Sequence, residues 1–317
     1  MPVSLLSPSG KPSRTVVVLV ATTLALALAG CAAGLPATGE GSSTRSPRIV
    51  RVVAAENFWG SIVAQLGGTH AQVISIIDNP NTDPHAYEPT AADARVLADA
   101  QVAVQNGAGY DPWMSRLLAA DGGSRTVLDV GSLVGVALGR NPHLWYNPSY
   151  VEQFINAVTD DLVRADPADS VYFMARQTSY EQVGLSSYHA ALLRIRARFA
   201  GTPVGASESI VAYLCQAVGL DLVTPANFLR AVSEGSDVSA EDTVTIDRQI
   251  RTRAIAVYVE NTQNVTPDVA AQVSAARAVG IPRTSVTETL EPANSNFQDW
   301  QTGQLNSLYA ALDRSRG

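Results

Sequence analysis

The chain has 317 residues, and its 22 basic and 29 acidic residues give a formal net charge of −7 at pH 7. An acidic balance argues against a nucleic-acid partner and weakly favours a surface that handles cations. The chain has 2 cysteines, Cys31 and Cys215. The amino-terminal sequence indicates the compartment of the protein.

Residues 1–30 have the pattern of a lipoprotein signal peptide. Lys11 and Arg14 precede the apolar run TVVVLVATTLALALAG, which ends at Gly30. A basic stretch followed by an apolar stretch too short for a comfortable transmembrane helix is typical of a secretory signal. The run closes in LAGC, which resembles the bacterial lipobox, so we expect Cys31 to carry a lipid as the first mature residue. The alternative is an ordinary signal peptide with an incidental cysteine.

Residues 31–48 are rich in Gly, Ser, Thr and Pro and show no periodicity, so we expect a flexible tether. The predicted location is the outer face of the plasma membrane, where the lipid anchors the protein without spanning the bilayer. With Cys31 lipidated, Cys215 is the only thiol, which excludes an intramolecular disulfide and a cysteine metal cluster. The apolar run around Cys215, IVAYLCQAVGL, predicts a buried side chain.

Residues 49–168 predict an amino-terminal α/β lobe. Segments typical of strands begin near Arg48, Ala71 and Gln101, and helical patterns follow the first two of them, at 58–68 and 89–100. Strands that alternate with helices indicate βαβ units and a parallel sheet.

Residues 169–200 predict one long helix. Apolar residues recur at helical spacing, proline is absent and Gly184 is the single internal glycine. A helix of this length would extend about 48 Å at the usual rise per residue. A rigid helix of that length between two lobes limits how far they can swing.

Residues 201–317 repeat the style of the first lobe. Strand patterns at 202–209, 254–261 and 281–288 alternate with helical patterns at 210–220 and 266–280. We therefore predict the α/β class: two doubly wound lobes joined by one rigid helix. Folds of this type gather ligand groups at the carboxyl ends of their strands.

Two of the 4 histidines occupy such positions. His85 in DPHAYEP and His143 in NPHLWYNP each follow a proline, in a loop after a strand-like segment. Proline restricts the conformations of such a turn. Acids and amides nearby could orient the two imidazoles: Asp83, Glu88, Asn141 and Asn147. The alternative is two ordinary turn histidines. His70 is expected to be solvated, and His189 to be a surface or packing residue.

A divalent ion needs further donors, and without free cysteines these must be oxygen or nitrogen. In the second lobe, the strand ends GASES and SVTET each carry one carboxylate, Glu208 and Glu288. They are the natural candidates for the remaining ligands. The alternatives are a first-turn helix acid for Glu208 and a solvated loop acid for Glu288.

Four separated motifs then carry a family resemblance. They are DPHAYEPTAADARVLADAQVAVQNGAGYDPWM, NPHLWYNP, SESIVAYLCQAVGL and TETLEPANSNFQDWQTGQL, in this order after the lipobox. Together they resemble the zinc/manganese solute-binding receptors of bacterial ABC importers, across residues 49–317. The resemblance implies two lobes joined by a rigid helix, and one metal ion held in the cleft and delivered to an importer permease with its ATPase.

Residue by residue, the resemblance places the family's first two ligands on His85 and His143. The third, often histidine in zinc receptors and glutamate in manganese receptors, falls on Glu208. The fourth is usually aspartate and falls on Glu288, one methylene longer, so Glu291 is a nearby substitute.

Two imidazoles and two carboxylates balance a 2+ charge and suit Zn²⁺, or Mn²⁺ and Fe²⁺ if the carboxylates bind through both oxygens. The ligand set does not decide between Zn²⁺ and Mn²⁺. We therefore expect a monomeric metal receptor and not an enzyme. Two competing interpretations remain from other classes: a secreted zinc metallohydrolase using the same ligands, and a surface adhesin involved in cell adhesion.

Overall fold

The computed structural model describes residues 48–317, which contain two parallel β-sheets of four strands each. The first sheet has the order β2-β1-β3-β4, with β1 (Val50–Glu56), β2 (Ala71–Ile77), β3 (Val102–Gln105) and β4 (Thr126–Asp129). The second has the order β6-β5-β7-β8, with β5 (Pro203–Ala206), β6 (Asp221–Leu222), β7 (Val257–Asn261) and β8 (Arg283–Val286). The predicted signal peptide, Cys31 and all of the predicted tether except Arg48 lie outside the described residues.

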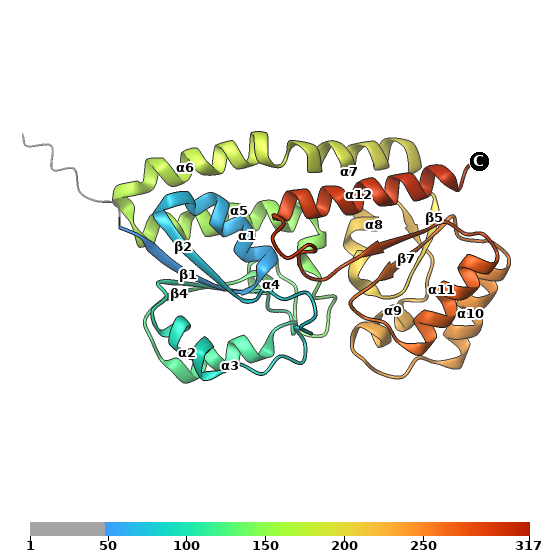
Figure 1. Ribbon diagram of the computed structural model, residues 1–317, viewed down its shortest axis with the longest axis horizontal. Helices are drawn as coiled ribbons and strands as arrows, with labels where there is room; N and C mark the ends of the chain where they lie inside the picture. The colour runs from blue at the N-terminus through green and yellow to red at the C-terminus, as the bar shows by residue number, and fades with distance from the viewer. Residues whose placement is uncertain (1–47) are drawn as a thin grey trace, which may run out of the picture. The chain divides into compact units, whose positions relative to one another are not determined.

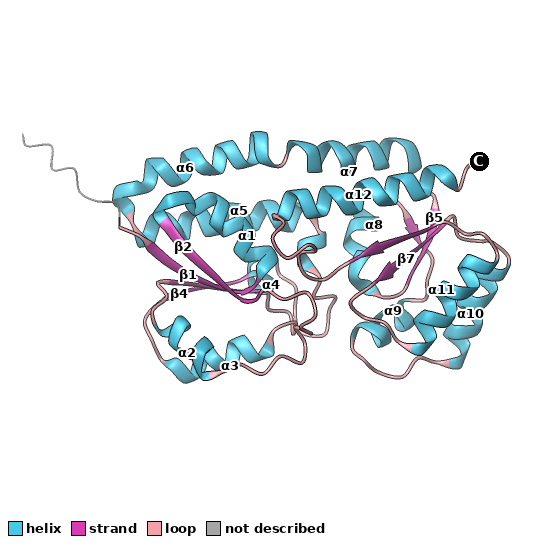
Figure 2. Ribbon diagram, viewed as in Figure 1, coloured by secondary structure: helices cyan, strands magenta, loops and turns pink. Residues whose placement is uncertain are grey.

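The two sheets share one topology. Figure 2 shows each sheet among its helices. In each, the strand order reverses between the first and third strands, β1 and β3 or β5 and β7. Crevices at the carboxyl ends of strands beside such a reversal are where doubly wound sheets bind ligands. The predicted fold class is confirmed by this arrangement.

Helices cover both faces of each sheet (Figure 1). Those of the described residues are α1 (Asn57–Gly67), α2 (Ala91–Ala98), α3 (Pro112–Asp121), α4 (Val130–Leu133), α5 (Pro148–Ala165), α6 (Ser170–Ser179), α7 (Ser186–Phe199), α8 (Ala212–Val218), α9 (Ala226–Ser233), α10 (Ala240–Arg251), α11 (Pro267–Ala278) and α12 (Phe297–Arg314). Alternate residues of β1 face opposite layers, because Val52 and Ala54 join one apolar cluster while Val53 and Ala55 join another.

One apolar cluster passes through both lobes. It contains Val52 and Val104 of the first sheet, Val204 and Val259 of the second, and Tyr188 of α7. Burial of apolar surface is the main favourable term in folding. This shared cluster therefore stabilises the two lobes together. Figure 1 shows α12 running beside α7, which it contacts.

The connection between the lobes is helical but not uniform. A π-helical turn, Tyr180–Gly184, separates α6 from α7, and the Leu185 N–H donates to the Tyr180 carbonyl at 2.8 Å. A Cβ on Gly184 would lie 2.8 Å from Cδ2 of Tyr180, so the missing side chain lets this ring pack against the turn. The single regular helix predicted over 169–200 is therefore a long helix with a local widening.

The connection is also fixed to the first lobe at its start. His70 lies 2.8 Å from Asp169 through Nδ1 and stacks on the ring of Tyr172 at 3.7 Å. The sequence predicts a solvated His70, whereas its side chain is 19% exposed and contacts Asp169. Because Asp169 comes more than ninety residues later in the chain, sequence proximity gave no sign of it.

Several strands and helices were not predicted from the sequence. Strand β4 and helix α3 lie in residues left unassigned, and so do α5, α9, α10 and α12. Cys215 is buried as expected. Within the described residues, no helix combines the length and apolar character needed to cross a membrane.

Candidate metal centre

The loop after β2 carries His85. The carboxylate of Asp83 accepts the backbone N–H of His85 at 2.9 Å, and the carbonyl of Pro84 accepts the Trp113 indole N–H at 3.1 Å. The turn is thus held from both sides, while the imidazole ring stays partly exposed and meets the edge of Tyr110, with ring centroids 4.6 Å apart. Asp83 fixes the backbone of this turn and not the ring nitrogen.

The loop between α4 and α5 carries His143, whose ring is fully buried. Its Nδ1 lies 2.7 Å from the Oδ1 of Asn141, and the amide nitrogen of Asn141 donates to the Ser209 carbonyl at 2.9 Å. The network therefore assigns the ring proton to Nδ1 and leaves Nε2 with a free lone pair. Nε2 is buried without a hydrogen-bond partner. In a metal-binding histidine, one ring nitrogen binds the ion while the other is held by a hydrogen bond. His143 has this arrangement, because Asn141 holds Nδ1 and Nε2 is available.

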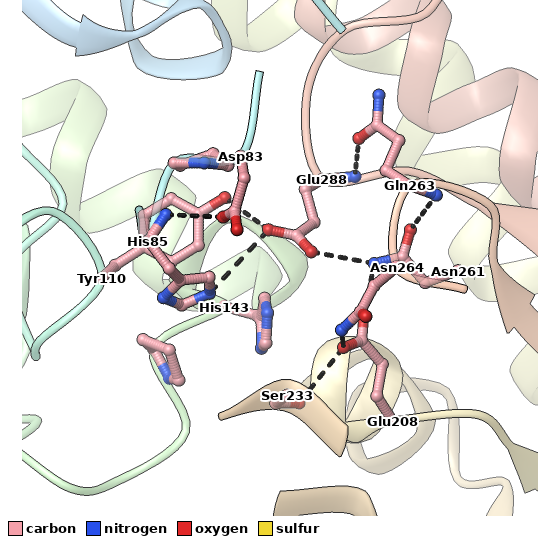
Figure 3. Close-up of polar contacts among 12 residues, drawn as sticks. Asp83, His85, Tyr110, His143, Glu208, Ser233, Asn261, Gln263, Asn264 and Glu288 are labelled. Carbon is pink, nitrogen blue, oxygen red and sulfur yellow. Dashed lines mark hydrogen bonds and ion pairs between the residues drawn. The ribbon is translucent and has the colours of Figure 1, made fainter. Parts of the chain in front are cut away.

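Glu288 follows β8 and faces the two histidines across the cleft (Figure 3). Its Oε2 lies 3.9 Å from Nε2 of His85 and accepts the Tyr110 hydroxyl at 2.8 Å. Its Oε1 accepts the Asn261 amide N–H at 2.9 Å. One potential ligand atom from each of His85, His143 and Glu288 lies within 4.8 Å of the others. The structure thus brings together three of the four predicted ligands.

The fourth, Glu208, is buried at the end of β5 but stands outside that cluster. Its Oε2 accepts from Asn264 at 2.8 Å and from Ser233 at 3.3 Å, and its Oε1 accepts from Asn261. Glu291, the possible substitute for Glu288, is exposed and belongs to no cluster found among the described residues. Ligation by Glu208 stays a prediction, and Glu288 is favoured over Glu291.

Burial shapes the charges of this site. Desolvation raises the pKa of the Glu208 carboxyl to about 8, and the nearby Glu288 charge adds to the effect. Desolvation also raises the pKa of Glu288, against the attraction of His85. Burial lowers the pKa of His143 well below its ordinary value, with the repulsion of His85 as the second cause. His143 is therefore neutral near pH 7, as a metal ligand must be.

A cavity of about 580 Å³ opens onto the cluster. Its walls come from both lobes and include Pro80, Asp83, His85, Val232, Asn264 and Glu288. Two imidazoles and two carboxylates form an N/O donor set that suits Zn²⁺ and other divalent transition metals.

The structure adds residues that the sequence analysis missed. Tyr110 binds Glu288 through its hydroxyl, while Asn261 and Asn264 hold the two carboxylates. Asn261 is the last residue of β7, so it also lies at the carboxyl end of a strand, where such folds gather ligand groups. Of the four residues expected to orient the imidazoles, Asn141 alone bonds a histidine ring nitrogen. Asn147 instead caps α5, and Glu88 is exposed.

Comparisons with known proteins find relatives that are named for metal binding. Residues 52–311 match the family model described as "Zinc-uptake complex component A periplasmic". The manganese-binding lipoprotein MntA of Halalkalibacterium halodurans is 28% identical over 166 residues, which are 50% of this chain and 52% of that protein. The zinc-binding protein TroA of Treponema pallidum is 25% identical over 197 residues, 57% of this chain and 61% of that protein. The chain thus spans roughly half to three fifths of the length of these curated relatives.

A solved structure shares the fold. The periplasmic zinc-binding protein TroA from Treponema pallidum superposes with a TM-score of 0.71 and 21% sequence identity, covering 83% of this chain and 99% of that one. At this identity the likeness establishes the arrangement of the two lobes. The ligand set of the present chain stays a prediction.

Proposed function

The chain belongs to the family of periplasmic zinc-uptake components, and we propose that it is an extracytoplasmic receptor that captures one divalent transition-metal ion and delivers it to an ABC import permease with its ATPase. The observation that carries the proposal is the cluster of His85, His143 and Glu288, in which the buried Nε2 of His143 has no hydrogen-bond partner. The curated relatives named for manganese and for zinc support the metal as cargo.

In this proposal each lobe supplies half of the ligands. His85 and His143 come from the lobe at residues 49–168, and Glu208 and Glu288 come from the lobe at residues 201–317. The segment 169–200 joins them. The two carboxylates neutralise a 2+ ion, which lowers the cost of removing it from water. The cargo is Zn²⁺ or Mn²⁺.

Isothermal titration calorimetry with each ion tests the binding site, with the protein first stripped by a chelator. We expect one ion per chain and a loss of binding in Glu208→Ala. Wild-type affinity in that variant would remove Glu208 from the site. Elemental analysis of protein purified from its native host under metal limitation then identifies the ion taken up in the cell, because the affinity order favours Zn²⁺ in a test tube whatever the cargo.

The proposal includes a lipid anchor at Cys31 and a monomeric state. Both rest on the sequence, since Cys31 lies outside the described residues. Mass spectrometry of the amino-terminal peptide should find a diacylglycerol-modified Cys31, and Cys31→Ala should release the protein from the membrane fraction. An unmodified Cys31 inside an uncleaved or differently cleaved chain would contradict the anchor.

The competing functions are weaker. Catalytic zinc usually keeps three protein ligands and an open water position, whereas here Asn261 links a fourth candidate ligand, the carboxylate of Glu208, to Glu288 of the cluster. For an adhesin role, the contacts of the described residues point to no particular surface. Binding to host matrix would need its own assay.

A further inference from the structure

Asn261 connects the two carboxylates of the site (Figure 3). Its amide nitrogen donates to Oε1 of Glu208 and, at 2.9 Å, to Oε1 of Glu288. An amide nitrogen has two hydrogens, so one is available for each carboxylate. The side chain is 1% exposed, so water does not compete for either bond.

The orientation of this amide is fixed from behind. The Oδ1 of Asn261 accepts the Gln263 backbone N–H at 2.9 Å, and the Asn261 backbone N–H donates to Ser207 Oγ at 2.9 Å. A flipped amide would place its oxygen against two carboxylates and its nitrogen against an N–H donor. The donors of Asn261 must therefore face Glu208 and Glu288.

These bonds engage Oε1 of each carboxylate. Oε2 of Glu288 accepts the Tyr110 hydroxyl at 2.8 Å and faces His85. The corresponding oxygen of Glu208 accepts hydrogen bonds from Asn264 at 2.8 Å and from Ser233 at 3.3 Å. An arriving ion can replace those two bonds without disturbing Asn261.

Binding through both oxygens of a carboxylate is different. The group must rotate until both oxygens face the ion, and Asn261 resists that rotation because it holds Oε1 of both residues at once. One oxygen from each glutamate and one nitrogen from each histidine make a shell of four donors. Zn²⁺ commonly takes four ligands in a tetrahedron, whereas Mn²⁺ suits larger oxygen-rich shells.

We propose that Asn261 is a positioning residue that limits Glu208 and Glu288 to one metal-binding oxygen each, and that it thereby makes this a four-coordinate site that selects Zn²⁺ over Mn²⁺. The inference rests on the proposed function. It goes further by deciding between the two cargo ions from a residue that does not touch the metal.

Co²⁺ tests the coordination number directly, because four-coordinate tetrahedral Co²⁺ absorbs visible light much more strongly than six-coordinate Co²⁺. We expect the wild-type protein loaded with Co²⁺ to give the strong tetrahedral spectrum. In Asn261→Ala the band should weaken, and the ratio of the Mn²⁺ to the Zn²⁺ dissociation constant should fall by about tenfold or more, the usual size of an outer-shell effect. Asn261→Ser provides a second variant that keeps a polar group there.

Asn264→Ala is the matched control, since the only carboxylate oxygen that Asn264 bonds is Oε2 of Glu208, the atom that the ion would bind; its other bond is to the Val232 carbonyl. It should keep the tetrahedral spectrum, and the two dissociation constants should move together. An unchanged spectrum and ratio in both Asn261 variants would overturn the inference. A weak six-coordinate spectrum in the wild-type protein would overturn it without any variant, even if both variants failed to fold. Failure of the proposed function looks different, because the wild-type protein would then bind none of the three ions.

Discussion

At the scale of single residues, His143 is the clearest ligand candidate. Its ring is buried, Asn141 holds Nδ1, and Nε2 is left without a hydrogen-bond partner beside His85 and Glu288. An unpaired buried polar atom costs free energy unless something binds it. A metal ion would satisfy this atom, which explains why the protein tolerates it.

Removing this ligand should therefore abolish tight binding. We expect His143→Ala and Glu288→Ala each to weaken metal binding by more than about 100-fold, beyond the effect typical of an outer-shell partner. Calorimetry measures the loss, and circular dichroism checks that each variant is folded. Glu291→Ala is the control, since Glu291 is exposed and should keep the wild-type affinity. The opposite result for Glu288 and Glu291 would exchange their roles.

Glu208 predicts a pH dependence of the metal-free protein. Burial and Glu288 raise the pKa of its carboxyl from 4.5 to about 8 in the folded state. Between these values the folded chain keeps a proton that the unfolded chain loses, so this contribution to stability is complete below about pH 4.5 and is lost as pH rises through about 8.

Glu208→Gln removes that proton equilibrium and nearly keeps the shape of the side chain. Chelator-treated wild-type protein and this variant should have similar unfolding free energies near pH 5. By pH 9 the variant should be more stable by a few kcal/mol, because one unit of pKa shift corresponds to about 1.4 kcal/mol. Urea unfolding at a series of pH values measures the difference. A difference that stays constant with pH would mean that Glu208 is already ionised in the folded protein.

At the scale of elements, the π-helical turn in the connection depends on Gly184. A Cβ at this position would come within 2.8 Å of the buried Tyr180 ring. Gly184→Ala should lower the unfolding free energy by about 1 kcal/mol, because overpacking outweighs the gain in helix propensity. Gly303→Ala is the control: it lies within α12 with open space around its missing Cβ, and should be neutral or stabilising. Two stabilising substitutions would show that the turn does not depend on the missing side chain.

Some of these helices and strands could be predicted from the sequence, and others could not. The apolar sequences of β1 and β7 predict buried strands. The two histidine loops could be predicted because proline, histidine and polar residues follow strand-like segments. The family resemblance is confirmed by the match over residues 52–311. Strand β6 has only two residues, which is too short a pattern to identify. The start of α12 carries a signal that was missed, because Asn296 caps the helix and Asp299 lies in its first turn.

The site was only partly predictable for a related reason. Spacing along the chain indicates which residues reach a strand end, but not how they bond once they meet there. Asn261 is an example, since its role depends on Glu208 and Glu288, which lie 53 and 27 residues away. The position of Glu208 outside the three-residue cluster likewise follows from Asn261, Asn264 and Ser233 together.

At the scale of the whole described chain, the shared apolar cluster makes the two lobes one folding unit. Residues of both sheets and of the connection belong to it, among them Val52, Val204 and Tyr188. We expect a single calorimetric unfolding transition, because neither lobe can lose this cluster alone. Zn²⁺ at a hundred times its dissociation constant should add about 2.7 kcal/mol and raise the transition temperature. Two separate transitions, with metal acting on one of them, would contradict a shared core.

A metal-bound crystal structure with anomalous scattering from the ion would show whether one ion is held by both lobes. We expect a single peak in the cleft, coordinated by His85, His143, Glu288 and Glu208, with the Glu208 carboxylate moved away from Asn264 and Ser233. A peak held by three protein ligands and an exchangeable water, or a peak elsewhere in the molecule, would contradict it.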